Sequence, residues 1–223
     1  MNLFFRLSAK LVSGLLHPLV IPTYALFLLL WMNPYLFGVS RWSDESMLIW
    51  HVLFMTCLLP FLVVFMMRQL GMVDSIHLHK REERIAPYIA TGIFYLWLFI
   101  NLANSHVVPL PYVVFILGTV IALFLDFFVN NFTKISAHGT GMGGLIAFVL
   151  LCMTAWGYEF FWLNMGPLGS HEMRLSWVFL IILVIAGIVG SSRLLLKAHT
   201  HKQIYAGFIV GAISQYIAYL ILG

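Results

Sequence analysis

The chain has 223 residues, of which 62% are hydrophobic and 9% are charged, and its formal net charge is +4. Soluble domains usually contain roughly 45–50% hydrophobic and about 25% charged residues, so this chain has too few charges to cover a water-facing exterior. These numbers exclude a soluble globular enzyme, a disordered chain, a coiled coil and a collagen, and the mean hydropathy of +0.98 indicates several membrane crossings.

Seven hydrophobic runs are long enough to cross a bilayer, at about 20 residues per crossing. They lie at about 12–33, 47–67, 88–104, 110–129, 141–157, 175–191 and 203–222. The first run is the least secure span, because His17, Pro18 and Pro22 lie inside it and are expected to kink or half-bury the helix. We therefore expect an all-α, polytopic transmembrane helix bundle of six to seven spans, forming a single domain over residues 1–223.

Alternating crossings place the N-terminus and the loops after the second, fourth and sixth runs on the same side of the membrane. These loops contain nearly every cluster of ionisable residues, at 74–84, 134–138 and 192–203. Of the 12 Lys and Arg residues, all but Arg41 and Arg174 fall on this side, which the positive-inside rule assigns to the cytoplasm. A phosphate site recruits Arg for its own reasons, however, so this charge count orients the chain only weakly.

Three loops that bring Arg, Lys and His to one rim predict a basic pocket at the lipid–water boundary. A lipid phosphate is the natural small anion there, and the planar guanidinium of Arg matches phosphate oxygens. Two histidines on separate loops can divide the work of phosphoryl transfer, one attacking phosphorus and the other protonating the leaving oxygen.

Two of these loops resemble signature motifs of the type 2 phosphatidic acid phosphatase (PAP2) superfamily. Residues 192–199 read S-R-x5-H and are similar to the third signature, S-R-x5-H-x3-D, while residues 136–138 read S-A-H and are similar to the second, P-S-G-H. The first signature, K-x6-R-P, is matched in residue types but not in spacing, by Lys80, Arg84 and Pro87. The resemblance covers roughly residues 80–212, and the core that carries the motifs is about 74–215.

The resemblance implies a phosphatase that works through a phosphohistidine intermediate without a metal or another cofactor. By position, His199 is the nucleophile and His138 the general acid. Gln203 stands where most of the family has Asp, so it can fix the His199 tautomer but cannot stabilise a positive imidazole as a carboxylate would. The residues expected to bind phosphate are Arg84, Arg81, Lys80, Ser136 and Arg193.

The function implied is hydrolysis of a lipid phosphomonoester or diphosphate in the inner (cytoplasmic) membrane of a bacterium. Residues 199–203 are similar to the H-T-x-x-Q motif of the dolichyldiphosphatase branch, which favours a polyprenyl diphosphate such as undecaprenyl diphosphate over a phosphatidate-type lipid. The expected partners are this lipid phosphate and membrane lipids, with no nucleic acid. The alternative is a non-catalytic lipid-phosphate binding protein or transporter built on the same fold.

Several residues have a plainer interpretation beside the functional one. His17 is expected to be interfacial or structural, and Lys134 fits an anchor for anionic lipids as well as a site residue. Asp126 either orients a catalytic group or is a carboxylate at the membrane interface. Gly207 and Gly211 permit close helix packing, and faces of small residues like theirs are also a possible surface for a homo-oligomer.

Overall fold

The computed structural model describes residues 3–75, 82–105, 107–164 and 169–223. Six helical stretches within these residues are long and apolar enough to cross a membrane. They are Pro34–Gln69, Glu82–Ala103, Leu110–Asn130, Ala137–Thr154, Leu175–Leu195 and His201–Leu222. The prediction of an all-α polytopic bundle of six to seven spans is therefore confirmed.

The first predicted span is divided into two helices, α1 (Leu3–Leu15) and α2 (Ile21–Met32), of which α2 is a shorter apolar helix. The chain turns at residues 16–20, next to Pro18, because a proline in a helix interior removes a backbone donor and clashes with the preceding turn. Pro22 is tolerated because it lies in the first turn of α2, where its missing N–H has no partner to lose.

The second predicted span is a nearly continuous helical stretch. It is built from the 3-10 turns η1 (Pro34–Phe37) and η2 (Trp42–Glu45), then α3 (Ser46–Leu53), the π-helical turn η3 (Phe54–Leu58) and α4 (Leu59–Gln69). Pro60 cannot donate to the carbonyl of Thr56 four residues earlier, and the hydroxyl of Tyr95 donates to that carbonyl across 3.2 Å. Tyr95 belongs to the next spanning helix, so a proline in one span is compensated by a side chain of another.

Replacing Tyr95 with Phe should lower the free energy of unfolding by about 1 kcal/mol, because the hydroxyl is the only group removed and its acceptor lies in the protein interior. Thermal unfolding of the purified protein in detergent measures this change. Tyr24→Phe is the matched control, since the Tyr24 hydroxyl also donates to a backbone carbonyl, that of Leu15, but in an exposed position. Equal losses in the two variants would contradict the prediction.

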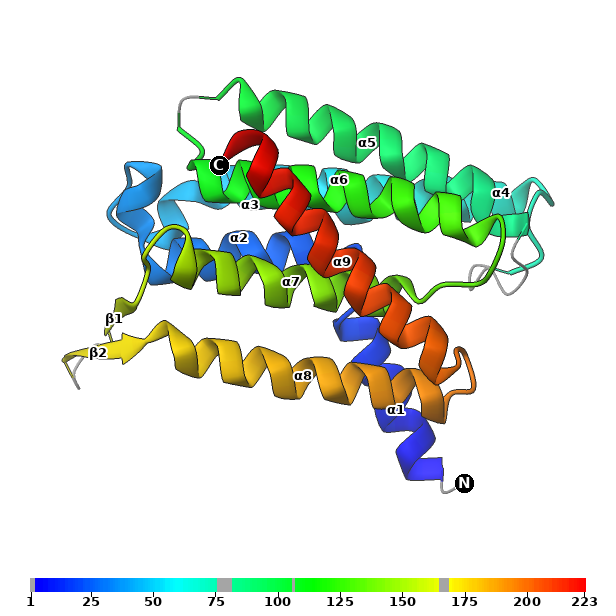
Figure 1. Cartoon of the computed structure of the whole chain (residues 1–223). Coiled ribbons are helices and arrows are strands. Elements are labelled where there is room, and N and C mark those ends of the chain that lie inside the picture. The colour runs from blue at the N-terminus through cyan, green and yellow to red at the C-terminus, as the bar shows by residue number, and fades with distance from the viewer. Residues whose placement is uncertain (1–2, 76–81, 106, 165–168) are drawn as a thin grey trace.

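The remaining elements complete the bundle. They are η4 (Glu82–Arg84), α5 (Ile85–Ala103), α6 (Leu110–Asn130), α7 (Ala137–Thr154), β1 (Phe160–Asn164), β2 (Ser170–Arg174), α8 (Leu175–Leu195) and α9 (His201–Leu222). The antiparallel hairpin β1–β2, which pairs Phe160 with Arg174, was not predicted, and it lies at the end of the bundle opposite the N-terminus (Figure 1).

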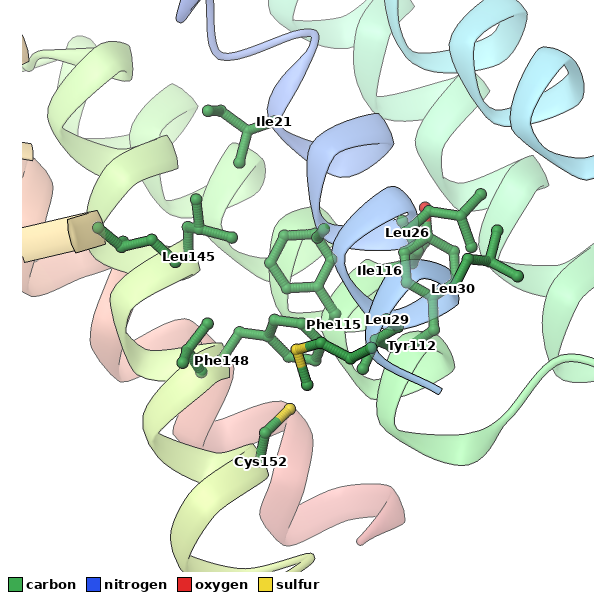
Figure 2. Packing of buried hydrophobic residues seen from close by; sticks show 14 of the residues in the cluster. Ile21, Leu26, Leu29, Leu30, Tyr112, Phe115, Ile116, Leu145, Phe148 and Cys152 are labelled. Carbon is green, nitrogen blue, oxygen red and sulfur yellow. The ribbon is translucent and has the colours of Figure 1, made fainter. Parts of the chain in front are cut away.

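The hydrophobic core lies where α2, α6 and α7 meet. Leu26, Leu29 and Leu30 of α2 face Tyr112, Phe115 and Ile116 of α6, with Leu145, Phe148 and Cys152 of α7 beside them (Figure 2). The Tyr112 hydroxyl donates to the carbonyl of Pro22 across 3.0 Å. Helix α2 is therefore held inside the bundle although it is too short to be counted among the six spans.

Helices α7 and α9 cross obliquely and touch through glycines (Figure 1). A Cβ atom at Gly139 would lie 2.8 Å from the carbonyl oxygen of Ile204, and one at Gly207 would lie 2.6 Å from that of Ser136. Gly143 and Gly211 face backbone of the opposite helix even more closely. Gly207 and Gly211 thus pack inside the chain, and the homo-oligomer stays a prediction.

Candidate active site at one end of the bundle

The start of α5, the loop before α7 and the loop between α8 and α9 all lie at the end of the bundle near the N-terminus (Figure 1). Arg84 Nη1 donates to the carbonyl of Ile135 across 3.5 Å, and Lys134 Nζ donates to that of Ala198 across 3.0 Å. The backbone N–H of Ser136 donates to the carbonyl of Gln203 across 3.3 Å. The predicted convergence of three sequence-distant loops is confirmed. Lys80 and Arg81 fall outside the described residues.

His199 is held in one tautomer by Gln203. The Gln203 Oε1 atom lies 3.2 Å from His199 Nδ1 and also 3.2 Å from the backbone N of Thr200. Because the Thr200 N–H can only donate, the Gln203 atom that it meets must be the oxygen, and an oxygen can only accept from His199 Nδ1–H. The proton of a neutral His199 is therefore on Nδ1, and Nε2 keeps the lone pair that a nucleophile needs.

The environment of His199 disfavours its protonated form. Burial lowers the pKa of His199 from its ordinary value of 6.5 to about 3, and the nearby cations Lys134, Arg193 and Arg84 act in the same direction. The contact with Gln203 only partly opposes this shift. His199 is therefore neutral at physiological pH in the unliganded protein, and a bound anion would relieve the repulsion that surrounds it.

Acidification should destabilise the protein through His199. Between its ordinary pKa of 6.5 and its folded pKa of about 3, the unfolded state binds more protons at this position than the folded state, so the free energy of unfolding falls as the pH falls. We expect the thermal unfolding temperature in detergent to be lower at about pH 4 than at about pH 7, and we expect His199→Asn to make this difference smaller. An unchanged difference in the variant would contradict the assignment.

His138 occupies the first turn of α7 and is 9% exposed. Its Nε2 lies 2.9 Å from the carbonyl oxygen of Ser13 in α1, so Nε2 carries a proton that Ser13 accepts. The ring of His17 packs against that of His138 edge to face, with 5.3 Å between centroids. Sequence reasoning gave His17 a structural or interfacial role and did not single out Ser13, yet both lie against the predicted general acid.

Ser136 is fully buried and is the N-cap of α7, where its Oγ accepts from the backbone N–H of Gly139 across 3.3 Å. One turn later, the Thr140 hydroxyl donates to Asp126 Oδ1 across 2.9 Å. Asp126 is only 3% exposed, so it is an interior residue that contacts the first turns of α7 and not a carboxylate at the membrane interface. The observed role of Ser136 is that of a cap, and its role as a phosphate ligand stays a prediction.

Arg193 lies at the end of α8 and is half-buried. Its Nε atom is shielded from solvent and has no hydrogen-bond partner among the residues that the structure describes. The positive charge of Arg84 repels that of Arg193. Burial lowers the pKa of Lys134, and the charges of Arg84 and Arg193 lower it further. A buried guanidinium N–H without an acceptor is costly, so this cluster of cations is suited to receive an anion.

A pocket of about 510 Å³ opens beside His199. It is bounded by Lys134 and Gln203 and by residues of the connection between α8 and α9, including Lys197. No group of three or more His, Cys, Asp or Glu side chains that could hold a metal ion is found in the described part of the chain. The pocket is lined by His199 and by the cations Lys134 and Lys197, whereas Arg84, Arg193 and His138 are not among its lining residues.

Comparison of the chain with protein-family models, with curated proteins and with solved structures found no match.

Proposed function

We propose that this protein is a membrane phosphatase that removes phosphate from a lipid phosphomonoester or diphosphate through a phosphohistidine intermediate. The observation that carries the proposal is the pair of contacts at Gln203, which fix His199 with a proton on Nδ1 and a lone pair on Nε2. A neutral imidazole held in this way beside three cations is suited to attack phosphorus.

In the first step, His199 Nε2 forms a bond to the terminal phosphorus while the bond from phosphorus to the leaving oxygen breaks. Arg193, Arg84 and Lys134 balance the charge on the phosphoryl oxygens. In the complex the bound anion favours the imidazolium form of His138, protonated on both ring nitrogens, which gives its Nε2 proton to the leaving oxygen and becomes a neutral imidazole. The leaving oxygen must take the place that the Ser13 carbonyl holds in the unliganded protein. Water then attacks the phosphohistidine, with His138 taking up a proton as general base, and releases inorganic phosphate.

The resemblance of residues 199–203 to the dolichyldiphosphatase motif favours a polyprenyl diphosphate as the substrate, and the membrane would be the inner membrane of a bacterium. A diphosphate offers a second phosphate whose charge the same cations can neutralise. A phosphatidate-type lipid presents the same terminal phosphate and is the second choice.

The test is release of inorganic phosphate by the purified protein in detergent with EDTA present, from undecaprenyl diphosphate and from phosphatidate. We expect turnover that EDTA does not remove, and an acid-labile phosphate on the protein when the reaction is quenched early. Saturable binding of either lipid without phosphate release would overturn the proposal that the protein is an enzyme. It would favour a non-catalytic lipid-phosphate binding protein or transporter. Turnover abolished by EDTA would instead indicate a metal-dependent reaction.

A further inference from the structure

A second pocket, of about 370 Å³, lies between α1 and α8. Each helix presents one face to it, because the lining residues recur three and four positions apart. Figure 1 shows that α1 crosses α8 near the end of α8 that carries Arg193. The lining residues are Phe5, Ser8, Ala9 and Val12 of α1, and Val184, Gly187, Ile188, Ser191, Ser192 and Leu195 of α8. We call this pocket the α1–α8 groove.

The α1–α8 groove is open because its floor consists of small residues. A Cβ atom built at Gly187 would meet no atom within 4 Å, whereas the glycines between α7 and α9 are in contact with backbone. Its walls are apolar, and Phe5, Val184 and Ile188 are all exposed. A groove of this kind at membrane depth accommodates hydrocarbon.

The groove adjoins the candidate active site along both of its helices, although the two pockets share no lining residue. Val12 and Ser192, which line it, are each followed in sequence by a site residue, namely Ser13 and Arg193. The Ser13 carbonyl accepts from His138, and Arg193 is one of the three cations. From Arg193 the groove follows α8 back to Val184, nine residues earlier and hence about 14 Å deeper into the bundle at 1.5 Å per residue.

We propose that the α1–α8 groove binds the hydrocarbon chain of the lipid whose phosphate occupies the candidate active site. This proposal rests on the proposed function, and it names the chain-binding part of the same site. The charge distribution selects this occupant, because an anionic head group is held at the cationic end while the apolar walls continue toward the middle of the span. A neutral membrane lipid would use only the apolar walls.

The first experiment compares two diphosphates that share a head group, geranylgeranyl diphosphate with a long chain and isopentenyl diphosphate with a short one. Gly187→Leu fills the groove without striking a neighbour, and Gly14→Leu is the matched control, since a Cβ there also meets nothing and Gly14 does not line the groove. We expect Gly187→Leu to lower kcat/KM for the long chain about tenfold and to leave the short chain within about twofold. Equal effects on the long and the short chain, or no effect on either, would overturn the proposal that the groove binds the hydrocarbon chain. Turnover by the wild-type protein would still support the proposed phosphatase activity.

The second experiment does not depend on turnover. Ser191→Cys is introduced after replacement of the two free cysteines, Cys57 and Cys152, and its rate of alkylation by a small maleimide is measured. Geranylgeranyl diphosphate should slow alkylation at least about fivefold, whereas isopentenyl diphosphate and geranylgeraniol should not, and Gly14→Cys should respond to none of them. Protection of the cysteine from alkylation without any phosphate release would support chain binding in the groove and overturn the proposed phosphatase activity. Equal protection by geranylgeraniol would mean that the groove accepts any lipid chain and would overturn the proposal.

Discussion

Replacing His199 with Ala should reduce phosphate release from a lipid diphosphate by at least about a thousandfold, because removal of a nucleophile eliminates the covalent route entirely. Two other residues of the site do not offer a substitute nucleophile. Gln203 is an amide, and the general acid candidate His138 has its Nε2 directed to Ser13. The loss should appear in kcat, while binding of the substrate persists because the cations Arg84, Lys134 and Arg193 remain.

Steady-state release of inorganic phosphate measures this loss, and rapid acid-free quenching followed by phosphohistidine detection shows whether the covalent intermediate disappears with it. The control is His51→Ala, the same chemical change at an exposed histidine of α3. His138→Ala should slow formation and hydrolysis of the intermediate without preventing it, since an acid assists the step that a nucleophile makes possible. Turnover that survives in His199→Ala would refute the assignment of the nucleophile.

The arrangement of the site could be predicted from the sequence because alternation of hydrophobic runs is a strong signal. It placed the loops around residues 84, 134 and 199 on one side, and the structure joins them through Arg84, Lys134 and Ser136. The resemblance to the phosphatase motif likewise implied that Gln203 fixes the His199 tautomer, and the two side chains are in contact. The first of these inferences depends only on periodicity, which a single sequence displays.

Other parts of the site could not be predicted, because they depend on how helices pack. Ser13 and His17 lie in the first hydrophobic run, where Pro18 and Pro22 predict a kink but nothing local indicates that the kink brings α1 against His138. The sequence fits Lys134 as a lipid anchor as well as a site residue, and only the fold shows that its ammonium group donates to the carbonyl of Ala198. The hairpin β1–β2 was missed because its strands flank a turn and carry no regular apolar alternation.

Gly211 makes the closest contact with the backbone of another helix among the glycines that the structure describes. A Cβ atom there would overlap the backbone carbonyl of Thr140 and crowd the backbone N of Gly144, neither of which can move without displacing α7. Gly211→Ala should therefore lower the free energy of unfolding by about 1–3 kcal/mol, even though alanine favours a helix more than glycine does. Gly14→Ala, in the exposed part of α1 where a Cβ meets nothing, should have the opposite sign and stabilise by about 0.5–1 kcal/mol.

Thermal unfolding of both variants in detergent distinguishes the two effects, since the chemical change is identical and only the packing differs. A larger side chain, in Gly211→Leu, should prevent recovery of a monodisperse protein by size-exclusion chromatography. Gly211→Ala should also slow any phosphate release, because the α7–α9 contact sets the Ser136 N–H against the Gln203 carbonyl and so positions His138 relative to His199. If Gly211→Ala and Gly14→Ala stabilised the protein equally, the close crossing of α7 and α9 would be wrong.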